Sequence, residues 1–326
     1  MRDRVVVVTG AGGFIGSHLA EHLVREGARV RAFVHYRSDG GLGWLGESPL
    51  ARDMEIIAGD IREPERIREA CRGAGAVFHL AALVGIPYSK LSPAAYIATN
   101  VMGTHHVLDA AREGGASSIV VVSTSEVYGS ARRVPMDEEH PTSAQSPYAA
   151  TKIAAEQLAL SYHRAFGLPV RVVRPFNAYG PRQSARAVIP AVIAQFAAGV
   201  RPVRVGNVDP TRDFTFVTDT VKGLVAASGC AGLGGEIANV GSGAEVSIEA
   251  MIVAVAGLMG VAPEWVSNES QRRSEGMEVS RLCCDASKVR RLTGWVPQVE
   301  FAEGLRETIG WIRSNLGRYR PGQYAV

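Results

Sequence analysis

Four consecutive valines, Val5 to Val8, are followed directly by a glycine-rich turn and then by a helical pattern that runs to Glu26. A continuous apolar run is typical of a strand that is buried on both faces of a parallel sheet. Glycines let the turn come close to a pyrophosphate, and a helix N-terminus adds free N–H groups and a favourable dipole. An isolated glycine turn would say little, but strand, turn and helix in this order predict a dinucleotide site. The turn is Thr9-Gly10-Ala11-Gly12-Gly13-Phe14-Ile15-Gly16.

Strand and helix signals go on alternating through the first half of the chain. Further strands are predicted at 30–34, 55–58, 76–80, 119–122 and 170–173, with helices at 65–71, 100–112 and 148–166. Repeated alternation predicts an α/β fold with a doubly wound parallel sheet of the Rossmann type. We assign this dinucleotide-binding domain to residues 1–175.

After Pro175 the pattern is less regular, with many glycines and prolines and only short helical stretches. We assign residues 176–326 to a smaller α/β substrate domain, and we expect its segments to be interleaved with the first domain. Asp219 is expected to serve as the N-cap of a helix in this part of the chain.

Composition and residue spacing argue against several classes of protein. A net charge of +3 is too small to indicate nucleic-acid binding. No apolar run reaches the roughly 18 residues of a membrane span, and the chain starts without a signal-peptide pattern. The histidines show no metal-binding spacing, and the four cysteines form no C-x-x-C pair. We therefore expect a reduced cytoplasmic protein without a bound metal.

The spacing Gly10-x-x-Gly13-x-x-Gly16 resembles that of the extended short-chain dehydrogenases, and further segments fall at positions of the epimerase/dehydratase family. The resemblance implies that Asp60-Ile61 contacts the adenine and that His79-Leu80-Ala81-Ala82 lines the cofactor. It also implies a cofactor role for Asn100, at the start of a predicted helix.

The predicted second strand ends without the carboxylate that usually binds the ribose 2′-hydroxyl of NAD. This region reads Phe33-Val34-His35-Tyr36-Arg37-Ser38. Arg37 or His35 could hold the 2′-phosphate of NADP, or Arg37 could simply be exposed. We expect NAD, with NADP still open.

Tyr148 and Lys152 lie four residues apart at the start of a predicted helix, so they share one helix face. An ammonium group near the tyrosine, together with the nicotinamide charge, would favour the phenolate. The phenolate could then take a proton from a sugar hydroxyl while hydride leaves the same carbon. Family resemblance implies that Thr124 hydrogen-bonds the reacting hydroxyl.

The triplet Thr124-Ser125-Glu126 narrows the predicted chemistry. Glu126 could abstract the C5 proton once C4 is a ketone, which is the step that leads to loss of the 6-hydroxyl. Sugar-nucleotide 4,6-dehydratases carry such a glutamate, but UDP-glucuronate decarboxylases carry the same triplet. A C4-epimerase needs only threonine, tyrosine and lysine, and Glu126 would then be a surface residue.

Resemblance also assigns the substrate contacts. Asn177 matches the family asparagine that contacts the sugar diphosphate, and Arg212 and Arg281 match its diphosphate arginines; the plain alternative is that these arginines are surface residues. Arg186 belongs to the segment 181–186. This segment, with 33–44, 123–129, 145–152 and 319–326, is similar to the dehydratases of legionaminic acid biosynthesis.

The resemblance implies a nucleotide-diphosphate sugar as substrate, with a nucleotide-linked N-acetylglucosamine expected first. It also implies a homodimer, formed through the predicted helices 100–112 and 148–166. A decarboxylase and an epimerase stay open as enzyme alternatives. A dinucleotide-sensing regulator on the same fold is the remote one, since a sensor would not need the predicted catalytic residues.

Overall fold

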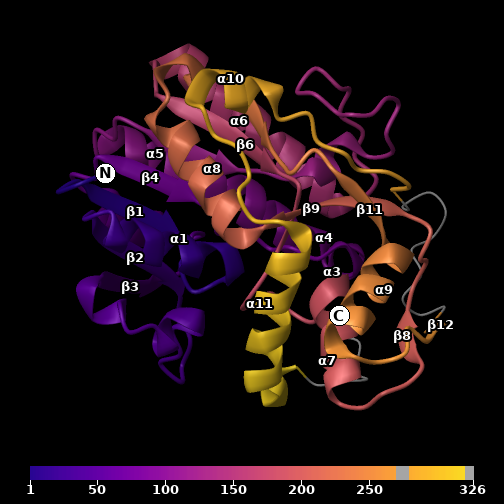
Figure 1. The fold of residues 1–326 in the computed structure, drawn as a ribbon. Coiled ribbons are helices and arrows are strands. Elements are labelled where there is room, and N and C mark those ends of the chain that lie inside the picture. Colours follow the sequence, from indigo (N-terminus) through magenta and orange to yellow (C-terminus); the bar gives the residue numbers. More distant parts are fainter. Residues whose placement is uncertain (269–278, 320–326) are drawn as a thin grey trace.

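The computed structural model describes residues 1–268 and 279–319 (Figure 1). Positions 320–326 of the tail segment named above lie outside these residues. Seven strands of the described chain form one sheet in which every neighbouring pair is parallel. Across the sheet these are β10 (Ile237–Val240), β6 (Val170–Pro175), β5 (Ile119–Val122), β4 (Ala76–His79), β1 (Val5–Thr9), β2 (Arg29–His35) and β3 (Glu55–Gly59).

The strand order starts at β1 and winds outward in both directions, so the predicted doubly wound parallel sheet is confirmed. β1 pairs with β2 from Val5↔Arg29 to Thr9↔Phe33, and its other edge pairs with β4. The predicted strands agree with the observed ones to within two residues at each end. β10, which had not been predicted, adds a strand from beyond residue 175 to the outer edge of β6.

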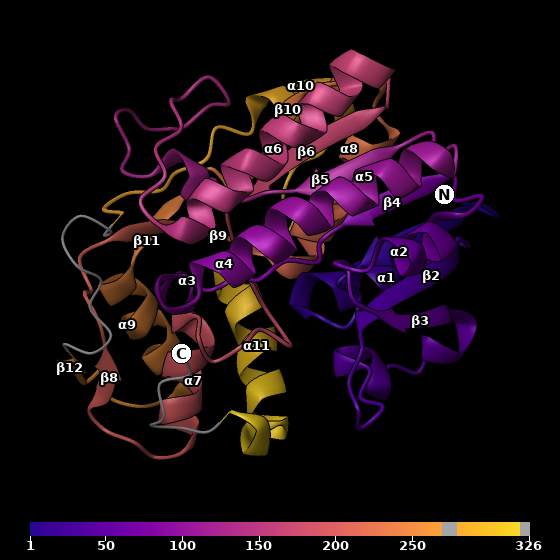
Figure 2. The ribbon, with the colours of Figure 1, turned by 180° about the vertical axis from the view of Figure 1, so that it is seen from behind.

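Helices cover both faces of this sheet. Figure 1 shows α1 (Phe14–Arg25) and α8 (Val217–Gly229) on one face, and Figure 2 shows α2 (Pro64–Cys71), α5 (Gly103–Glu113) and α6 (Pro147–Phe166) on the other. The valines of β1 alternate between the two layers: Val6 and Val8 belong to one buried cluster and Val7 to the other. This double burial explains the uninterrupted apolar run.

The second module has its own core. Its larger sheet has the order β11 (Glu245–Ser247), β9 (Thr211–Phe216), β7 (Asn177–Tyr179), and β12 (Trp265–Ser267) pairs with β8 (Val203–Val205). Three helices supply most of the remaining core residues: α7 (Val188–Ala197), α9 (Ile248–Met259) and α11 (Phe301–Ser314). Figure 1 shows them grouped beside the large sheet, and α10 (Ser287–Thr293) packs against α8 and β10.

Several short helical segments connect the longer elements. They are the turns Gly43–Glu47, Ala51–Asp53, Ala231–Leu233 and Leu316–Arg318, the helices α3 (Ile86–Leu91) and α4 (Pro93–Tyr96), and the turn η4 (Ser125–Tyr128). A π-helical segment, Ile97–Met102, precedes α5. The helix predicted at 100–112 is therefore regular only from Gly103, and Asn100 lies in the wider π-helical turn. Such turns occur often at functional sites.

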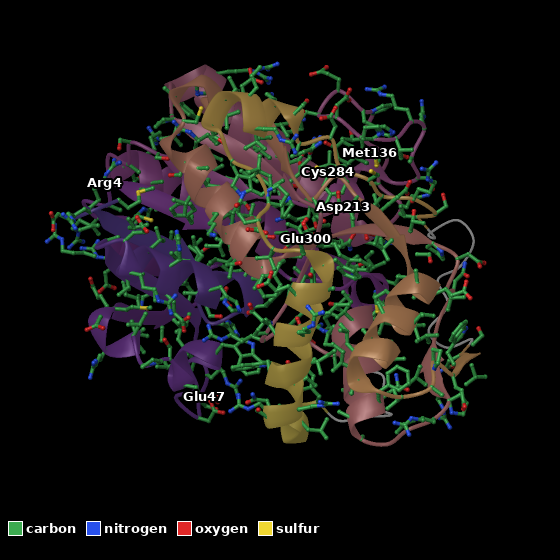
Figure 3. All side chains as sticks on the ribbon, viewed as in Figure 1. Arg4, Glu47, Met136, Asp213, Cys284 and Glu300 are labelled. Atoms are coloured by element: carbon green, nitrogen blue, oxygen red, sulfur yellow. The ribbon has the colours of Figure 1, made fainter. Side chains whose placement is uncertain are left out.

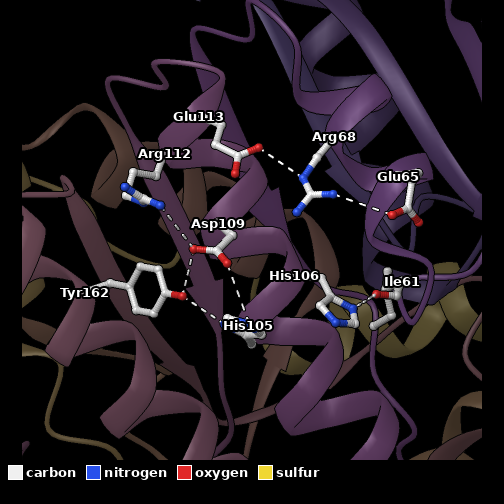
Figure 4. A network of polar contacts seen from close by, with 9 residues as sticks. All are labelled: Ile61, Glu65, Arg68, His105, His106, Asp109, Arg112, Glu113 and Tyr162. Carbon is white, nitrogen blue, oxygen red and sulfur yellow. Dashed lines mark hydrogen bonds and ion pairs between the residues drawn. The ribbon is translucent and has the colours of Figure 1, made fainter.

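A polar network ties α5 to its neighbours (Figure 4). The Tyr162 hydroxyl of α6 donates to Asp109 at 2.9 Å and lies 2.8 Å from His105 Nδ1. On the other side, Arg68 of α2 donates to Glu113 at 3.0 Å. Burial, followed by the contact with Asp109, raises the pKa of Tyr162 to about 12. The three helices are thus joined by polar contacts as well as by their apolar sides.

Asp219 corrects a prediction. Helix α8 starts at Val217 with Phe216 as its N-cap, so Asp219 lies inside the first turn and caps nothing. Its Oδ2 instead accepts the backbone N–H groups of Gln298 and Val299, at 2.9 and 2.8 Å. Asp219 therefore fixes the approach to α11, a partner distant in sequence.

The glycine turn supplies a test of the fold. A Cβ at Gly16 would overlap the carbonyl oxygen of Gly10, whereas a Cβ at Gly310 in α11 would meet no atom within 4 Å. We expect Gly16→Ala to lower the free energy of unfolding by about 1–3 kcal/mol. The matched Gly310→Ala should raise it by about 0.5–1 kcal/mol. Urea unfolding of both variants measures this, and equal stabilities would contradict the tight packing at Gly16.

Candidate active site

The glycine turn lies at the carboxyl end of β1 and forms an open cradle. Gly10 has φ +72°, and a Cβ there would lie 2.8 Å from the amide nitrogen of Ala81. Gly13 is the N-cap of α1 and has no side chain to cap it, which leaves the first-turn N–H groups around Phe14 and Ile15 for a ligand. Side chains at Gly10 and Gly16 would meet the protein's own backbone, so only glycine permits this turn. The helix N-terminus that the turn leaves open suits a pyrophosphate.

The end of β4 lies against this turn. The N–H groups of Leu80 and Ala81 both donate to Thr9 Oγ1 at 3.2 Å, and Ala82 continues from there. His79 points into the interior, where its Nδ1 lies 2.8 Å from Thr9 Oγ1 and its Nε2 2.9 Å from Thr104 Oγ1. Burial lowers the pKa of His79 to about 3, so this histidine is neutral. It supports the strand end from inside.

Asp60 and Ile61 follow β3 at the same edge of the sheet. Asp60 accepts two hydrogen bonds from the Arg62 guanidinium, at 2.9 and 2.6 Å, and these hold its pKa below the usual range. The Ile61 side chain is buried against Gly103, and its carbonyl oxygen accepts from His106 at 3.0 Å (Figure 4).

Arg37 follows β2 and forms an exposed bidentate ion pair with Asp39, at 3.1 and 2.7 Å. Arg37 also lines a pocket of about 470 Å³ beside the glycine turn, together with Gly12, Leu42 and Trp44. The backbone N–H of Trp44 donates to the Gly12 carbonyl at 3.0 Å, so the segment after β2 folds back onto the glycine turn.

Asn100 is buried and acts as a clamp. Its Oδ1 accepts the N–H of Leu83 at 2.8 Å, and its Nδ2 donates to the Leu83 carbonyl and to Thr151 Oγ1, both at 3.0 Å. Asn100 therefore links the segment after β4 to helix α6. Its side chain holds the walls of the site in position.

Tyr148 and Lys152 lie in the first turns of α6, which has Ser146 as N-cap and Pro147 as its first residue. Both side chains are buried. The Tyr148 hydroxyl shares a hydrogen bond with Thr124, which follows β5. Lys152 Nζ donates to the Val122 carbonyl at 2.6 Å. The end of β5 and the start of α6 thus bring the three predicted residues together.

The electrostatics of this pair differ from the simplest expectation. Burial raises the pKa of Tyr148, and the hydrogen bond with Thr124 opposes this rise. Burial also lowers the pKa of Lys152 to about 8, against an opposing effect of Glu156. Burial therefore disfavours the charged form of both side chains. A positively charged nicotinamide beside them would favour the phenolate.

Ser125 and Glu126 begin the turn η4, directly after Thr124. Thr124 Oγ1 caps this turn by accepting the Glu126 N–H at 3.2 Å. Ser125 is buried and Glu126 is half-buried. The negative charge of Glu126 is close enough to Tyr148 to raise the pKa of that hydroxyl further. Thr124 thus contacts Tyr148 through its side chain and holds the turn that contains Glu126.

The predicted substrate residues come from the second module. Asn177 starts β7, and its buried Oδ1 has no hydrogen-bond partner within the described chain. Arg186 is exposed, and its Nη1 would lie 3.4 Å from a Cβ at Gly85. Its charge opposes the rise that burial causes in the pKa of Tyr96. Both residues lie where a ligand could meet them.

Arg212 and Arg281 are brought together by a bridge between Thr211 and Arg281. Arg212 is buried, and its Nη1 donates to the Thr211 carbonyl at 2.9 Å. Arg281 is half exposed and forms an ion pair with Glu245, which also accepts from Thr211. Two guanidinium groups from segments about 70 positions apart thus share one neighbourhood.

Asp213 anchors this neighbourhood. Its carboxylate is fully buried and accepts the N–H groups of Ser242, Gly243 and Cys284, at 2.8, 2.8 and 3.0 Å. Figure 3 shows Asp213 and Cys284 close to Met136, whose backbone pairs with Cys284. Sequence reasoning grouped Asp213 with Arg212 but did not identify this anchoring role.

Other supporting residues had not been predicted. The Tyr96 ring meets Tyr148 edge-on, with centroids 6.3 Å apart, and its hydroxyl donates to the Gly85 carbonyl at 2.7 Å. Glu156 forms a buried ion pair with Arg174. Its position four residues after Lys152 was a usable signal, whereas nothing in the sequence marks Tyr96.

The described residues hold neither a cluster suited to a metal ion nor a helix suited to a membrane. Residues 1–268 and 279–319 contain no group of three or more His, Cys, Asp or Glu side chains that could hold a metal ion. In the same ranges, no helix is long and apolar enough to cross a membrane.

The chain matches the sequence model of a family described as GDP-mannose 4,6 dehydratase over residues 7–308. A dTDP-glucose 4,6-dehydratase from Streptomyces antibioticus is 34% identical over 322 residues, 97% of this chain and 94% of that protein. A UDP-glucose 4-epimerase from Mycolicibacterium smegmatis is 34% identical over 313 residues, 94% of this chain and 98% of that protein.

A solved structure extends this similarity to three dimensions. DesIV, a dTDP-glucose 4,6-dehydratase from Streptomyces venezuelae with NAD bound, has a TM-score of 0.88 and 30% identity, and the match covers 97% of this chain and 99% of that one. The family-level resemblance is thereby confirmed. The chain belongs to the family described as GDP-mannose 4,6 dehydratase, within the extended short-chain dehydrogenases of the epimerase/dehydratase type.

Proposed function

We propose that the chain is an NAD-dependent sugar-nucleotide 4,6-dehydratase. The observation that carries the proposal is that Thr124 links the two proposed bases: it hydrogen-bonds the Tyr148 hydroxyl, and it caps the turn that contains Glu126. A carboxylate near the base of the C4 oxidation is the group that elimination requires. Both side chains lie beyond the carboxyl end of β5, on the side of the sheet where ligands of doubly wound folds bind.

The chain's residues have separate roles in this proposal. Thr124 holds the 4-hydroxyl of the sugar, Tyr148 takes its proton, and Lys152 supports the phenolate through its charge. Bound NAD supplies an acceptor for the C4 hydride, which is later returned to C6. Glu126 removes the C5 proton once C4 is a ketone, and the C6–O bond breaks. Glu126, with Ser125 beside it, supplies the proton with which the 6-hydroxyl leaves as water. Return of hydride to C6 leaves an enolate, which takes a proton at C5 that exchanges with solvent. One molecule of water is lost in total, and the redox change is internal.

Cofactor binding is proposed for the cradle of Gly10, Gly13, Phe14, Ile15 and Gly16, with Arg37, Asp60, Ile61, Leu80, Ala81, Ala82 and Asn100 around it. Relatives solved with NAD support this assignment. NAD is proposed over NADP because these relatives were solved with NAD bound. We keep residues 1–175 as the NAD-binding part and 176–326 as the substrate part, with β10 as an interleaved segment.

The proposed substrate is a nucleotide-diphosphate sugar. Asn177, Arg186, Arg212 and Arg281 provide one amide and three guanidinium groups, and guanidinium groups suit phosphate. The resemblance to dehydratases of legionaminic acid biosynthesis favours a nucleotide-linked N-acetylglucosamine. Relatives named for dTDP-glucose make that hexose the second compound to test.

Two other enzyme activities share the first oxidative step. A UDP-glucuronate decarboxylase would lose carbon dioxide from C6, and a C4-epimerase would return hydride to C4. Epimerases among the relatives keep the second alternative open. A screen of nucleotide sugars by mass spectrometry separates the three, through loss of water, loss of carbon dioxide or unchanged mass. A dinucleotide sensor would show none of these reactions.

Tyr148→Phe tests the oxidative step. We expect turnover to fall by roughly 10²–10⁴-fold, because the general base is lost while the ring is kept. Binding of the nucleotide sugar, measured by calorimetry, should be nearly unchanged. Near-normal turnover would exclude Tyr148 as the base.

Glu126→Gln separates a dehydratase from an epimerase. The variant keeps its size but cannot take the C5 proton, so C4 oxidation should survive while elimination stops. In D₂O, wild type should incorporate deuterium at C5 and the variant should not, and absorbance of the reduced nicotinamide should persist in the variant. If the variant still releases dehydrated product with C5 deuterium, another residue is the base. Wild type that only inverts C4 would exclude the dehydratase.

A homodimer is proposed through α5 and α6. Ala150 and Ala154 are exposed on α6, and Ile97 and Met102 are about half exposed beside α5. We expect light scattering at micromolar concentration to give a dimer, and Ala154→Arg to give a monomer. Ala302→Arg, at an exposed alanine of α11, is the matched control. A wild-type monomer would refute the proposal.

A cytoplasmic location also stays a prediction, resting on the cysteine pattern.

A further inference from the structure

Arg174, in β6, touches two parts of the candidate site at once. Its Nε and Nη2 donate to the two carboxylate oxygens of Glu156, at 2.8 and 2.7 Å. Its guanidinium carbon also lies 4.7 Å from the centroid of the Tyr128 ring. The side chains of Arg174 and Glu156 are 2% and 0% exposed, so this contact is sealed from water.

The two partners of Arg174 belong to elements that carry different proposed catalytic residues. Glu156 lies on α6, four residues after Lys152 and eight after Tyr148, so the three side chains follow one helix face. Tyr128 ends the turn η4, which begins at Ser125 and contains Glu126. Arg174 therefore touches the helix of the proposed base for C4 oxidation and the turn of the proposed C5 base.

Tyr128 is itself held at its far end. Its hydroxyl donates to Asn239 Oδ1 at 2.7 Å, and Asn239 Nδ2 donates to the Met136 carbonyl at 3.0 Å. The ring is fully buried. A displacement of the guanidinium would therefore be transmitted to η4, because the Tyr128 ring cannot turn away independently.

Stability alone gives little reason for such a pair. Desolvation of two buried charges offsets much of their attraction, so replacing a buried ion pair by apolar groups is often neutral for folding. A planar guanidinium does, however, fix the orientation of its partners, because it binds a carboxylate through two parallel hydrogen bonds and stacks on a ring. The pair is better suited to setting geometry than to adding stability.

We propose that Arg174 is a positioning residue that sets the Glu126 carboxylate relative to the Tyr148 hydroxyl, so that C4 oxidation and C5 proton removal act on one bound sugar. This inference rests on the proposed function. Arg174 touches neither sugar nor cofactor in this proposal and acts through Glu156 and Tyr128. Glu156 also affects Lys152 directly. Burial lowers the pKa of this lysine, and the Glu156 carboxylate opposes that fall.

Arg174→Lys is the test, because it keeps a positive charge near Glu156 but loses the fork and the flat stacking surface. Arg171→Lys is the matched control. Arg171 lies on the same strand and is also buried, but its guanidinium donates to the carbonyls of Cys230 and Pro169. Both variants are assayed as dehydratases with UDP-N-acetylglucosamine and with dTDP-glucose.

Two rates are measured for each folded variant: the appearance of reduced nicotinamide, and the incorporation of deuterium at C5. We expect Arg174→Lys to slow C5 exchange about 10-fold or more beyond its effect on nicotinamide reduction, since small misplacements of a reacting group are costly. Arg171→Lys should change the two rates by the same factor. Equal losses in Arg174→Lys would mean a purely structural role and would overturn the proposal.

Hydrogen exchange of the protein without substrate gives a second readout. The N–H groups of Glu126 and Gly129 donate within η4, at 3.2 and 3.3 Å. We expect Arg174→Lys to speed exchange in the peptide 125–129, and Arg171→Lys to leave it unchanged. Unchanged protection in both variants would contradict coupling between Arg174 and η4.

If Arg174→Lys does not fold, Tyr128→Leu and Tyr128→Phe replace it. Leucine removes the ring under the guanidinium, whereas phenylalanine keeps the ring and loses only the hydroxyl. A selective loss of C5 exchange is expected from Tyr128→Leu, and a smaller one from Tyr128→Phe, which keeps the ring but releases it from Asn239. A loss in Tyr128→Leu that is equal for C5 exchange and nicotinamide reduction would overturn the proposal. Wild type without C5 exchange would instead refute the proposed function, and the positioning role with it.

Discussion

The parallel sheet is the constraint on which the rest of this structure depends. Because neighbouring strands run in one direction, all their carboxyl ends open at the same edge. The glycine turn, the segment after β4, and Thr124 are therefore neighbours although they are spread over more than 100 positions of the chain. The same arrangement needs helices on both faces, which is why β1 is apolar at every position from Val5 to Val8.

Buried polar groups join the parts of the chain that this edge brings close. Asn100 ties the segment after β4 to α6, and Asp213 ties β9 to the segments around Ser242 and Cys284. Each of these groups has its hydrogen-bond partners in distant segments, so its burial is tolerated only in the complete fold. The site is consequently a product of packing between both halves of the chain.

The electrostatics of Tyr148 show what such packing cannot supply. Burial opposes ionisation of the hydroxyl, and the ammonium group of Lys152 is directed to the Val122 carbonyl. A helix spacing of four residues guaranteed a shared face but not a direct contact between these two side chains. A positively charged nicotinamide would favour the phenolate, so we expect the proposed base to be activated in the occupied site.

Sequence alone determined the fold class, because strand burial, glycine turns and helix spacing are local patterns. It predicted the cofactor cradle from the same patterns, and it predicted Thr124, Glu126, Tyr148 and Lys152 as a group with the help of family resemblance. It did not reveal β10, whose four residues become an edge strand only against β6. It also assigned Asp219 to a helix cap, whereas that carboxylate binds backbone groups 79 and 80 positions away. The contact between Arg174, Glu156 and Tyr128 likewise joins three segments. Tertiary structure decided these features, because long-range hydrogen bonds and ion pairs are defined by distances in space, which periodicity along the chain does not encode.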